Sequence, residues 1–255
     1  MRWRSLILVV CVGGILNVLS PEMLNGNVFV PGELIQQSAA QLSVEELQKL
    51  AESITVKVLS GEVLGSGIVI HKQGSVYTVL TNEHVLRSGE PTYQIQTPDG
   101  RVYAADLPQT VSFNGNDLAL LQFRSAEVNY AVASLGKSPT VGDEVFAAGF
   151  KFVEEPSQDQ GLIFRTGKVS LVLDKALEGG YRIGYTNDIE KGMSGGPLLN
   201  LRGELVSING MHAEPLWGDP YVYEDGSEPE QKLKEQISRY SWGIPIETYV
   251  QLAPK

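Results

Sequence analysis

Hydrophobic and polar residues alternate with a period of two in many short segments of the chain. A first series of such segments covers 54–60, 63–70, 75–80, 93–97, 101–107 and 118–123. A second series covers 144–150, 161–173, 181–186, 197–200, 203–210 and 240–246. Gly, Asn, Pro or Asp occupies nearly every gap, and short strands at a spacing of about ten residues predict an all-β barrel or sandwich rather than a βαβ fold. Two barrels of about six strands each would use the chain well.

The N-terminal segment has a different pattern. Arg2 and Arg4 precede an apolar run from Leu6 to Leu19. A basic start followed by a short apolar stretch is typical of an export signal, and the run is short for a membrane-spanning helix. We expect 1–20 to be an export signal; an uncleaved anchor that attaches the chain to a membrane and a buried helix are the alternatives. Export would lead to the periplasm, the extracellular medium or a thylakoid lumen.

The segment that follows predicts little regular structure. Residues 21–42 contain Pro, Gly, Asn and Gln without clear periodicity, which indicates a linker or N-terminal arm. Ser43 and Glu46 then fit a capping box, in which the hydroxyl and the carboxylate satisfy free amides at a helix start. A short helix to about Glu52 is predicted.

The two series of strands divide the remaining chain. We interpret 43–255 as one domain, with a first barrel at about 54–125 and a second at about 130–253. A polar, acidic stretch at 213–239 interrupts the second series and predicts a long surface loop with a helical turn near 229–239.

Charge and composition exclude several function classes. The 255 residues include 20 Lys and Arg against 30 Asp and Glu, a net charge of −10. A surface that binds phosphate groups needs an excess of basic residues, so we expect no nucleic acid as partner. With one Cys, three His and no CxxC pair or His/Cys cluster, we expect no metal and no cofactor.

Three short segments carry residues suited to nucleophilic catalysis. His84 lies in LTNEHVL after a predicted strand, Asp117 lies in NDLALLQF at the start of a strand, and Ser194 lies in the glycine-rich KGMSGGPLLN. A serine hydroxyl is a poor nucleophile until an imidazole takes its proton, and a buried carboxylate holds that imidazole in the right tautomer. Each residue alone is ordinary, but the three together, at strand edges in the order His, Asp, Ser, predict a catalytic triad.

The glycines around the serine have a predicted role of their own. Gly192 frees the backbone so that its amide and that of Ser194 can point at a developing oxyanion. Gly195 and Gly196 let the chain pass close behind the nucleophile.

These motifs resemble those of the chymotrypsin-like serine peptidases, and most closely their bacterial HtrA/Deg-type branch. That branch reads TNxHV, (S/N)DxALL and GNSGGPLLN, which stand here as TNEHV, NDLALL and GMSGGPLLN. The segments 203–210 and 242–247 also match its last strands, so the likeness covers about 54–253.

The resemblance implies two six-stranded antiparallel β-barrels with the active site in the cleft between them. It implies a serine endopeptidase that cleaves polypeptide substrates through an acyl-enzyme. His84 would be the general base, Asp117 would orient it, and Ser194 would attack. The amides of Gly192 and Ser194 would form the oxyanion hole.

Substrate contacts are expected at two places. On the likeness, Ser207, Ile208 and Asn209 form the edge that pairs with an extended substrate. Counting back six residues from Ser194 places Asp188 near the base of the primary pocket, where trypsin-like enzymes keep an acid for Lys or Arg. The HtrA-type alignment leaves Asp188 at the rim instead, and an ordinary loop carboxylate is the remaining interpretation.

The chain departs from the branch at several points. Met193 replaces the usual Asn, or the Asp of animal digestive relatives, so we expect no zymogen activation by an ion pair and an effect on the oxyanion turn. Because the chain ends at Lys255, no PDZ domain is expected. The loop at 211–240 is longer and resembles a stretch of cyanobacterial trypsin-like domains. Relatives often form trimers through N-terminal segments, and 21–53 could make this chain a homo-oligomer.

Other interpretations stay open. Met193 favours a protease-like binding or scaffold protein with an incompetent site, which the intact trio opposes. An unrelated β-sandwich would make the three segments accidental turns. Asp219, Glu224 and Asp225 could bind calcium, but their spacing matches no known ligand loop, and a solvated loop fits better.

Overall fold

The structure is a computed structural model that describes residues 40–253, except 62, 88, 90, 109–110, 154–160 and 214–220. The expected export signal or anchor at 1–20 and nearly all of the expected arm at 21–42 lie outside the described residues, as does Asp219. No helix within the described ranges is long and apolar enough to cross a membrane.

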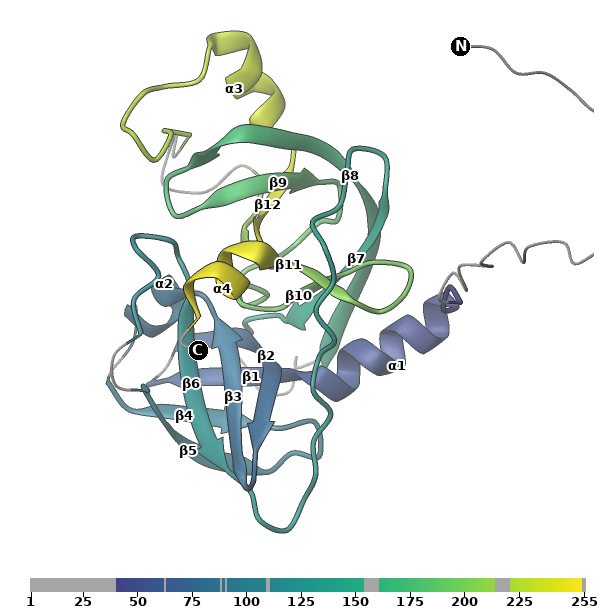
Figure 1. Cartoon of the computed structure of the whole chain (residues 1–255), viewed down its shortest axis with the longest axis vertical. Helices are drawn as coiled ribbons and strands as arrows, with labels where there is room; N and C mark the ends of the chain where they lie inside the picture. Colours follow the sequence, from purple (N-terminus) through teal and green to yellow (C-terminus); the bar gives the residue numbers. More distant parts are fainter. Residues whose placement is uncertain are drawn as a thin grey trace, which may run out of the picture. The chain divides into compact units, whose positions relative to one another are not determined.

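The strands form two closed antiparallel barrels (Figure 1). The first part of the described chain contains α1 (Val44–Ile54), β1 (Thr55–Ser60), β2 (Val63–Gln73), β3 (Val76–Thr81), α2 (Glu83–Arg87), β4 (Tyr93–Gln96), β5 (Val102–Asp106) and β6 (Ala119–Arg124). The second part contains β7 (Glu144–Phe150), β8 (Leu162–Leu177), β9 (Tyr181–Tyr185), β10 (Pro197–Leu199), β11 (Leu205–Met211), α3 (Gln231–Ile237), β12 (Ser241–Pro245) and α4 (Ile246–Leu252). The strands pair in the orders β1-β2-β3-β6-β5-β4 and β10-β11-β12-β9-β8-β7. The two six-stranded barrels predicted from the sequence are confirmed.

Helix α1 begins at the predicted capping box. The Glu46 N–H donates to Ser43 Oγ at 3.3 Å, and the Ser43 N–H donates to the Glu46 carboxylate at 2.8 Å. Leu47, Ala51 and Ile54 recur at helical spacing and are fully buried. The helix is therefore stabilised at its start by its own side chains and along one face by the barrels.

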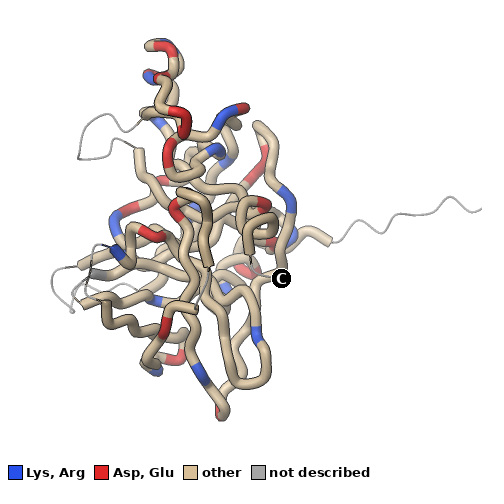
Figure 2. The backbone as a smooth tube through the Cα atoms, turned by 60° about the vertical axis from the view of Figure 1, so that its left-hand side comes forward, with Lys and Arg blue, Asp and Glu red and all other residues tan. Residues whose placement is uncertain are grey.

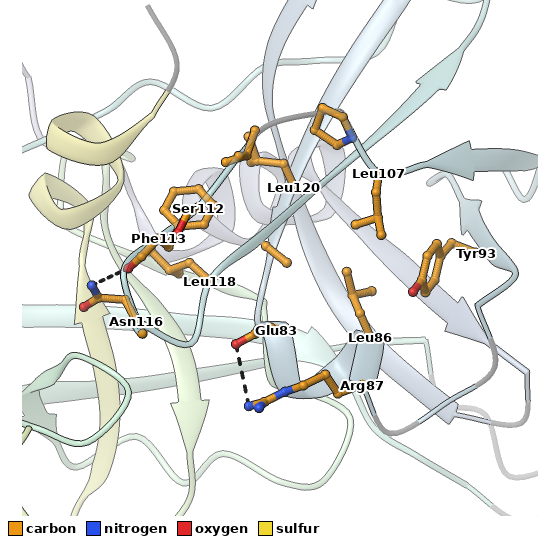
Figure 3. A pocket seen from close by; sticks show the side chains of 14 residues that line it. Glu83, Leu86, Arg87, Tyr93, Leu107, Ser112, Phe113, Asn116, Leu118 and Leu120 are labelled. Atoms are coloured by element: carbon orange, nitrogen blue, oxygen red, sulfur yellow. Dashed lines mark hydrogen bonds and ion pairs between the residues drawn. The ribbon is translucent and has the colours of Figure 1, made fainter.

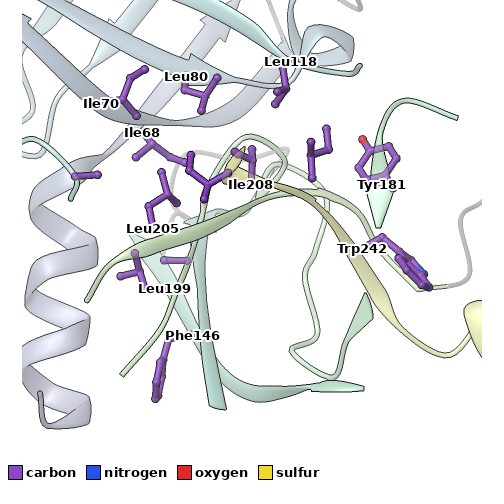
Figure 4. Close-up of a cluster of buried hydrophobic side chains, with 14 of the residues drawn as sticks. Ile68, Ile70, Leu80, Leu118, Phe146, Tyr181, Leu199, Leu205, Ile208 and Trp242 are labelled. Carbon is purple, nitrogen blue, oxygen red and sulfur yellow. The ribbon is translucent and has the colours of Figure 1, made fainter. Parts of the chain in front are cut away.

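A cluster of buried side chains joins the two barrels. Ile68, Leu80 and Leu118 of the first barrel face Leu205 and Ile208 of the second (Figure 4). Full burial of one such side chain contributes about 1.5–3 kcal/mol relative to leaving it exposed. The barrels are thus held against each other, so residues at their facing ends keep fixed positions.

The long loop predicted at 213–239 packs on the end of β8. Its described part contains α3, in agreement with the predicted helical turn. The Glu178 N–H donates to the Val222 carbonyl at 2.8 Å, and Lys175 forms an ion pair with the Asp225 carboxylate. These contacts tie the loop to the turn between β8 and β9.

Candidate active site

His84 and Asp117 form a hydrogen-bonded pair at one end of the first barrel. His84 lies on α2, directly after β3, and Asp117 lies in the turn that leads into β6. The Nδ1 atom of His84 is 2.6 Å from Asp117 Oδ2, and the His84 backbone N–H donates to Asp117 Oδ1 at 2.8 Å. Because an ionised carboxylate only accepts, Nδ1 carries the proton and Nε2 of the neutral ring is an acceptor.

The Asp117 backbone is fixed by residues from both barrels. The Asn82 side-chain amide donates to the Asp117 carbonyl at 2.7 Å, and the Asp117 N–H donates to the Gly179 carbonyl at 2.9 Å. The Tyr181 hydroxyl donates to Oδ2 of the carboxylate. Asp117 itself is only 7% exposed. The backbone contacts fix the position of Asp117, and the contacts of its side chain restrict rotation of the carboxylate. The carboxylate therefore presents one fixed face to His84.

The pKa of Asp117 reflects two opposing influences. Burial, the largest, raises it, but the hydrogen bonds and charge of His84 and the hydrogen bond from Tyr181 together lower it below its ordinary value. The carboxylate is therefore ionised at neutral pH.

Ser194 belongs to the second barrel, where it lies in the turn before β10. Its Oγ donates to the Gly210 carbonyl at 3.1 Å, and its own carbonyl accepts the Ser66 N–H from β2 at 2.8 Å. Gly195 has a φ of 84°, and a Cβ there would lie 2.1 Å from the Ser66 carbonyl oxygen. Only glycine allows this close approach of the serine turn to the first barrel.

The peptide groups around Ser194 are oriented by Ser66. The Ser66 hydroxyl donates to the Gly192 carbonyl at 2.8 Å and accepts the Phe150 N–H at 2.8 Å. Gly192 has a φ of 97°, and a Cβ there would lie 2.5 Å from the Phe152 nitrogen. Within the described ranges, the N–H groups of Gly192 and Ser194 have no hydrogen-bond partner.

Met193 is a core residue of the second barrel. Its side chain is fully buried and packs with Val145, Ile163 and Leu198. Its N–H donates to the Glu190 carbonyl at 2.9 Å, and its sulfur accepts the Glu190 N–H at 3.3 Å. Met193 therefore closes the turn from Glu190, so the turn before Ser194 forms with Met in the place of the usual Asn.

Glu190 anchors this turn to the neighbouring strands. Its carboxylate forms ion pairs with Lys151 and, at 3.0 Å, with Arg165. The Phe152 N–H donates to the Lys191 carbonyl at 2.8 Å. The hydrogen bond from Lys151 is the largest cause of a lowered pKa at Glu190; partial burial opposes it, and the charge of Lys151 and the contacts with Arg165 add to the lowering.

We expect Glu190→Gln to lower the free energy of unfolding by about 1 kcal/mol at neutral pH, because the ion pairs are lost while the side chain keeps its shape. A carboxylate with a depressed pKa contributes stability above its ordinary pKa of 4.5 and loses it as the pH falls through the folded-state value. In urea unfolding, the difference between wild type and variant should shrink below that pH. A difference that stays constant down to about pH 3 would show that charge plays no part.

The matched control for this variant is Glu204→Gln, which breaks an ion pair with Arg202 on the surface of the second barrel. Of these two carboxylate residues, only Glu190 contacts the turn of Ser194, so only Glu190→Gln should also slow a reaction at Ser194.

The residues expected to contact substrate differ in their burial. Ser207, Ile208 and Asn209 are fully buried and lie in β11 between β10 and β12. This differs from their expected role, because a strand that is paired on both sides has no edge to which a substrate can add. Asp188 is exposed after β9, as for a rim or loop carboxylate, and is not enclosed at the base of a pocket.

A pocket lies between α2, the helix that carries His84, and the stretch that leads to β6 (Figure 3). Its volume is about 380 Å³. Leu86, Leu118 and Leu120 contribute apolar surface, and Glu83 forms an ion pair with Arg87 at 3.6 Å beside it. Sequence reasoning gave no sign of this pocket.

Three further residues at the site were missed by sequence reasoning. Ser66, Tyr181 and Glu190 all contact the proposed triad or its turn. Ser66 had a weak signal, since it lies between two glycines in a strand, where a close backbone approach is common. No sequence signal indicated Tyr181 or Glu190.

Over both barrels, Lys and Arg are interspersed with Asp and Glu (Figure 2).

Comparison with known proteins places these features in a family. The family model described as trypsin-like peptidase domain matches residues 65–208. The periplasmic pH-dependent serine endoprotease DegQ of Escherichia coli is 37% identical over 150 residues, which are 58% of this chain and 31% of DegQ. The serine endoprotease DegS of Haemophilus influenzae is 27% identical over 210 residues, 77% of this chain and 58% of DegS. The mitochondrial serine protease HTRA2 of Drosophila grimshawi is 35% identical over 195 residues, 73% of this chain and 43% of that protein. The chain thus spans from under a third to just over half of the length of these relatives.

Solved structures support the same fold. A serine endoprotease from Yersinia pestis aligns with a TM-score of 0.58 at 23% identity, covering 83% of this chain and 65% of that one. An HtrA-type protease with a tripeptide aligns with a TM-score of 0.60 at 22% identity, covering 82% of this chain and 62% of that one. With a family model that matches more than half of its residues and two closed six-stranded barrels, the chain belongs to the family of trypsin-like peptidase domains.

Proposed function

We propose that this chain is a serine endopeptidase of the HtrA type that uses His84, Asp117 and Ser194 as a catalytic triad. One observation carries the proposal. The buried Asp117 carboxylate accepts both the backbone N–H and the Nδ1 proton of His84, which leaves Nε2 as a base. The relatives named serine endoproteases support the same activity.

In the proposed mechanism, Ser194 Oγ attacks the carbonyl carbon of the scissile peptide while its proton passes to His84 Nε2. Asp117 stabilises the resulting imidazolium. The N–H groups of Gly192 and Ser194, which have no partner within the described ranges, donate to the oxyanion. His84 then gives its proton to the leaving amine, which yields an acyl-enzyme, and water hydrolyses this ester with His84 again as the base.

The substrate strand is proposed to pair with the end of β11. Gly210, Met211 and His212 are partly exposed, in contrast to the buried residues before them. The Gly210 carbonyl accepts the Ser194 hydroxyl in the free protein. When that hydroxyl turns to His84, the carbonyl is released and can accept a backbone N–H of the substrate. Substrate binding and activation of the nucleophile are thereby coupled.

The proposal includes export of the protein. It is supported by the basic and apolar pattern at 1–20 and by the periplasmic relatives, DegQ of Escherichia coli and the DegP-like protein of Buchnera aphidicola. Polypeptides are the proposed substrates.

Reaction with a fluorophosphonate tests the activity without knowledge of the natural substrate. The reagent loses fluoride as its phosphorus bonds to an activated serine oxygen. We expect the intact mass of the wild type to show one adduct, and Ser194→Ala to show none. Ser238→Ala, which removes a hydroxyl near α3, should be labelled like the wild type. No adduct on the wild type, or equal labelling of Ser194→Ala, would contradict the proposed triad.

A further inference from the structure

A tyrosine from the second barrel contacts the carboxylate of the proposed triad. Tyr181, the first residue of β9, donates its hydroxyl hydrogen to Asp117 Oδ2, the same oxygen that faces His84 Nδ1. Tyr181 is 7% exposed. The carboxylate therefore accepts from two groups of His84, in its own barrel, and from Tyr181, in the other.

The position of the Tyr181 ring depends on Gly210. A Cβ on Gly210 would lie 2.4 Å from Cε1, 2.5 Å from the hydroxyl oxygen and 2.8 Å from Cζ of Tyr181. A side chain at 210 would displace the ring, so the two residues are a matched pair. Because the Gly210 carbonyl accepts the Ser194 hydroxyl, the ring lies between the carboxylate and the backbone that holds the nucleophile.

The turn before Tyr181 is held from two sides. Gly179 accepts the Asp117 N–H at 2.9 Å, so the turn and the carboxylate residue are fastened to each other through the main chain. On the other side, the Glu178 N–H donates to the Val222 carbonyl in the long loop. The hydroxyl is therefore directed at the carboxylate by a backbone that has little freedom to move.

We propose that Tyr181 is a positioning residue of the triad, whose hydroxyl fixes the Asp117 carboxylate and shares the charge of Oδ2 with the His84 hydrogen bond. This inference rests on the proposed function. A donor on Oδ2 weakens the attraction of that oxygen for the imidazolium, so Tyr181 makes His84 a weaker base than the pair alone would be. It also prevents the carboxylate from rotating away from Nδ1.

Tyr181 stays a donor throughout the accessible pH range. Burial is the main cause that raises its pKa well above the ordinary value, and the charge of Asp117 raises the pKa further. The phenol therefore remains protonated and stays a donor to Asp117.

Tyr181→Phe tests the inference, because it removes the hydroxyl and keeps the ring. With rates divided by the number of fluorophosphonate-reactive sites, we expect kcat to fall about tenfold, as for loss of a hydrogen bond to a charged group. KM should not change, because Tyr181 is not proposed to touch substrate. The acidic limb of the pH profile of kcat/KM should move up by about half a unit, since the free oxygen stabilises the imidazolium more strongly.

Tyr77→Phe is the matched control. Tyr77 is also fully buried, but it pairs with Phe123 in the ladder of β3 and β6, six residues after Asp117 in the sequence. It should leave kcat and the pH profile unchanged, whatever stability it loses. If Tyr181→Phe behaves in the same way, with lower stability but an unshifted acidic limb, Tyr181 is structural only and the inference is overturned.

A difluorotyrosine at 181 gives a second measurement that does not depend on folding of the Phe variant. Fluorine makes the phenol a stronger donor with almost no change of shape, so the acidic limb should move to lower pH, opposite to the Phe variant. An unmoved limb would contradict the proposed role. Failure of the proposed function itself is distinguishable, because the wild type would then not react with the fluorophosphonate.

Discussion

Replacing Ser194 by Ala is expected to lower the turnover of a peptide substrate by about 10⁶-fold, because triad residues act as a unit and loss of the nucleophile removes nearly all of their effect. The variant should fold normally. Ser194 Oγ makes one hydrogen bond, to Gly210, and the turn itself is held by Ser66 and Glu190 through the main chain. Residual hydrolysis above the rate in water would come from the oxyanion donors and from substrate binding.

The measurement is kcat on an unstructured polypeptide, with thermal unfolding to verify the fold. Ser238→Ala should keep wild-type turnover. A loss of only a few-fold in Ser194→Ala would remove Ser194 from the mechanism, since no other hydroxyl is proposed to attack.

Asp117→Asn is expected to lower kcat by about 10⁴-fold, because it places His84 in the wrong tautomer. The contacts of this chain determine how an amide would be oriented. The backbone N–H of His84 needs an acceptor at the position of Oδ1, so the Asn oxygen occupies that place and its NH₂ faces His84 Nδ1. Nδ1 then becomes the acceptor, and Nε2 carries the hydrogen and cannot take the proton of Ser194.

The variant and the wild type should be compared over a pH range that reaches strongly basic solution. Hydroxide can take the serine proton without the imidazole. The difference in kcat between the wild type and Asp117→Asn should therefore become smaller as the pH rises. The reaction with fluorophosphonate should slow as well. Near-normal turnover at neutral pH would show that the Asp117–His84 hydrogen bond does not set the tautomer.

The fold was accessible from the sequence because its signals are local. Alternation with a period of two marked the strands, and glycines marked the turns around Ser194. His84 and Asp117 were recognisable because each follows or precedes a strand in a short motif. Ser43 and Glu46 identified the start of α1 for the same reason, since both halves of a capping box lie within four residues.

The remaining features of the site depend on contacts distant in sequence. Tyr181 and Asp117 are 64 positions apart, and Ser66 and Gly192 are 126 apart. No periodicity reports such contacts. The pairing of the expected substrate edge is another such contact, because Ser207 pairs with Pro245 of β12, which follows the long loop. Which part of a strand has a free edge is decided by its neighbours and not by its own residues.

Because the site is divided between the two barrels, its assembly depends on the folding of both. A chain is made from its N-terminus, and the strands around His84 and Asp117 are complete at β6. The turn of Ser194 needs β11, which in turn pairs with β12 near the end of the chain. Before the second barrel folds, the Ser66 hydroxyl lacks its contact with the Gly192 carbonyl, and the Asp117 carboxylate lacks its contact with Tyr181. Assembly of the proposed triad therefore requires that both barrels have folded, so a chain in which only the first barrel has formed is not expected to cleave peptides.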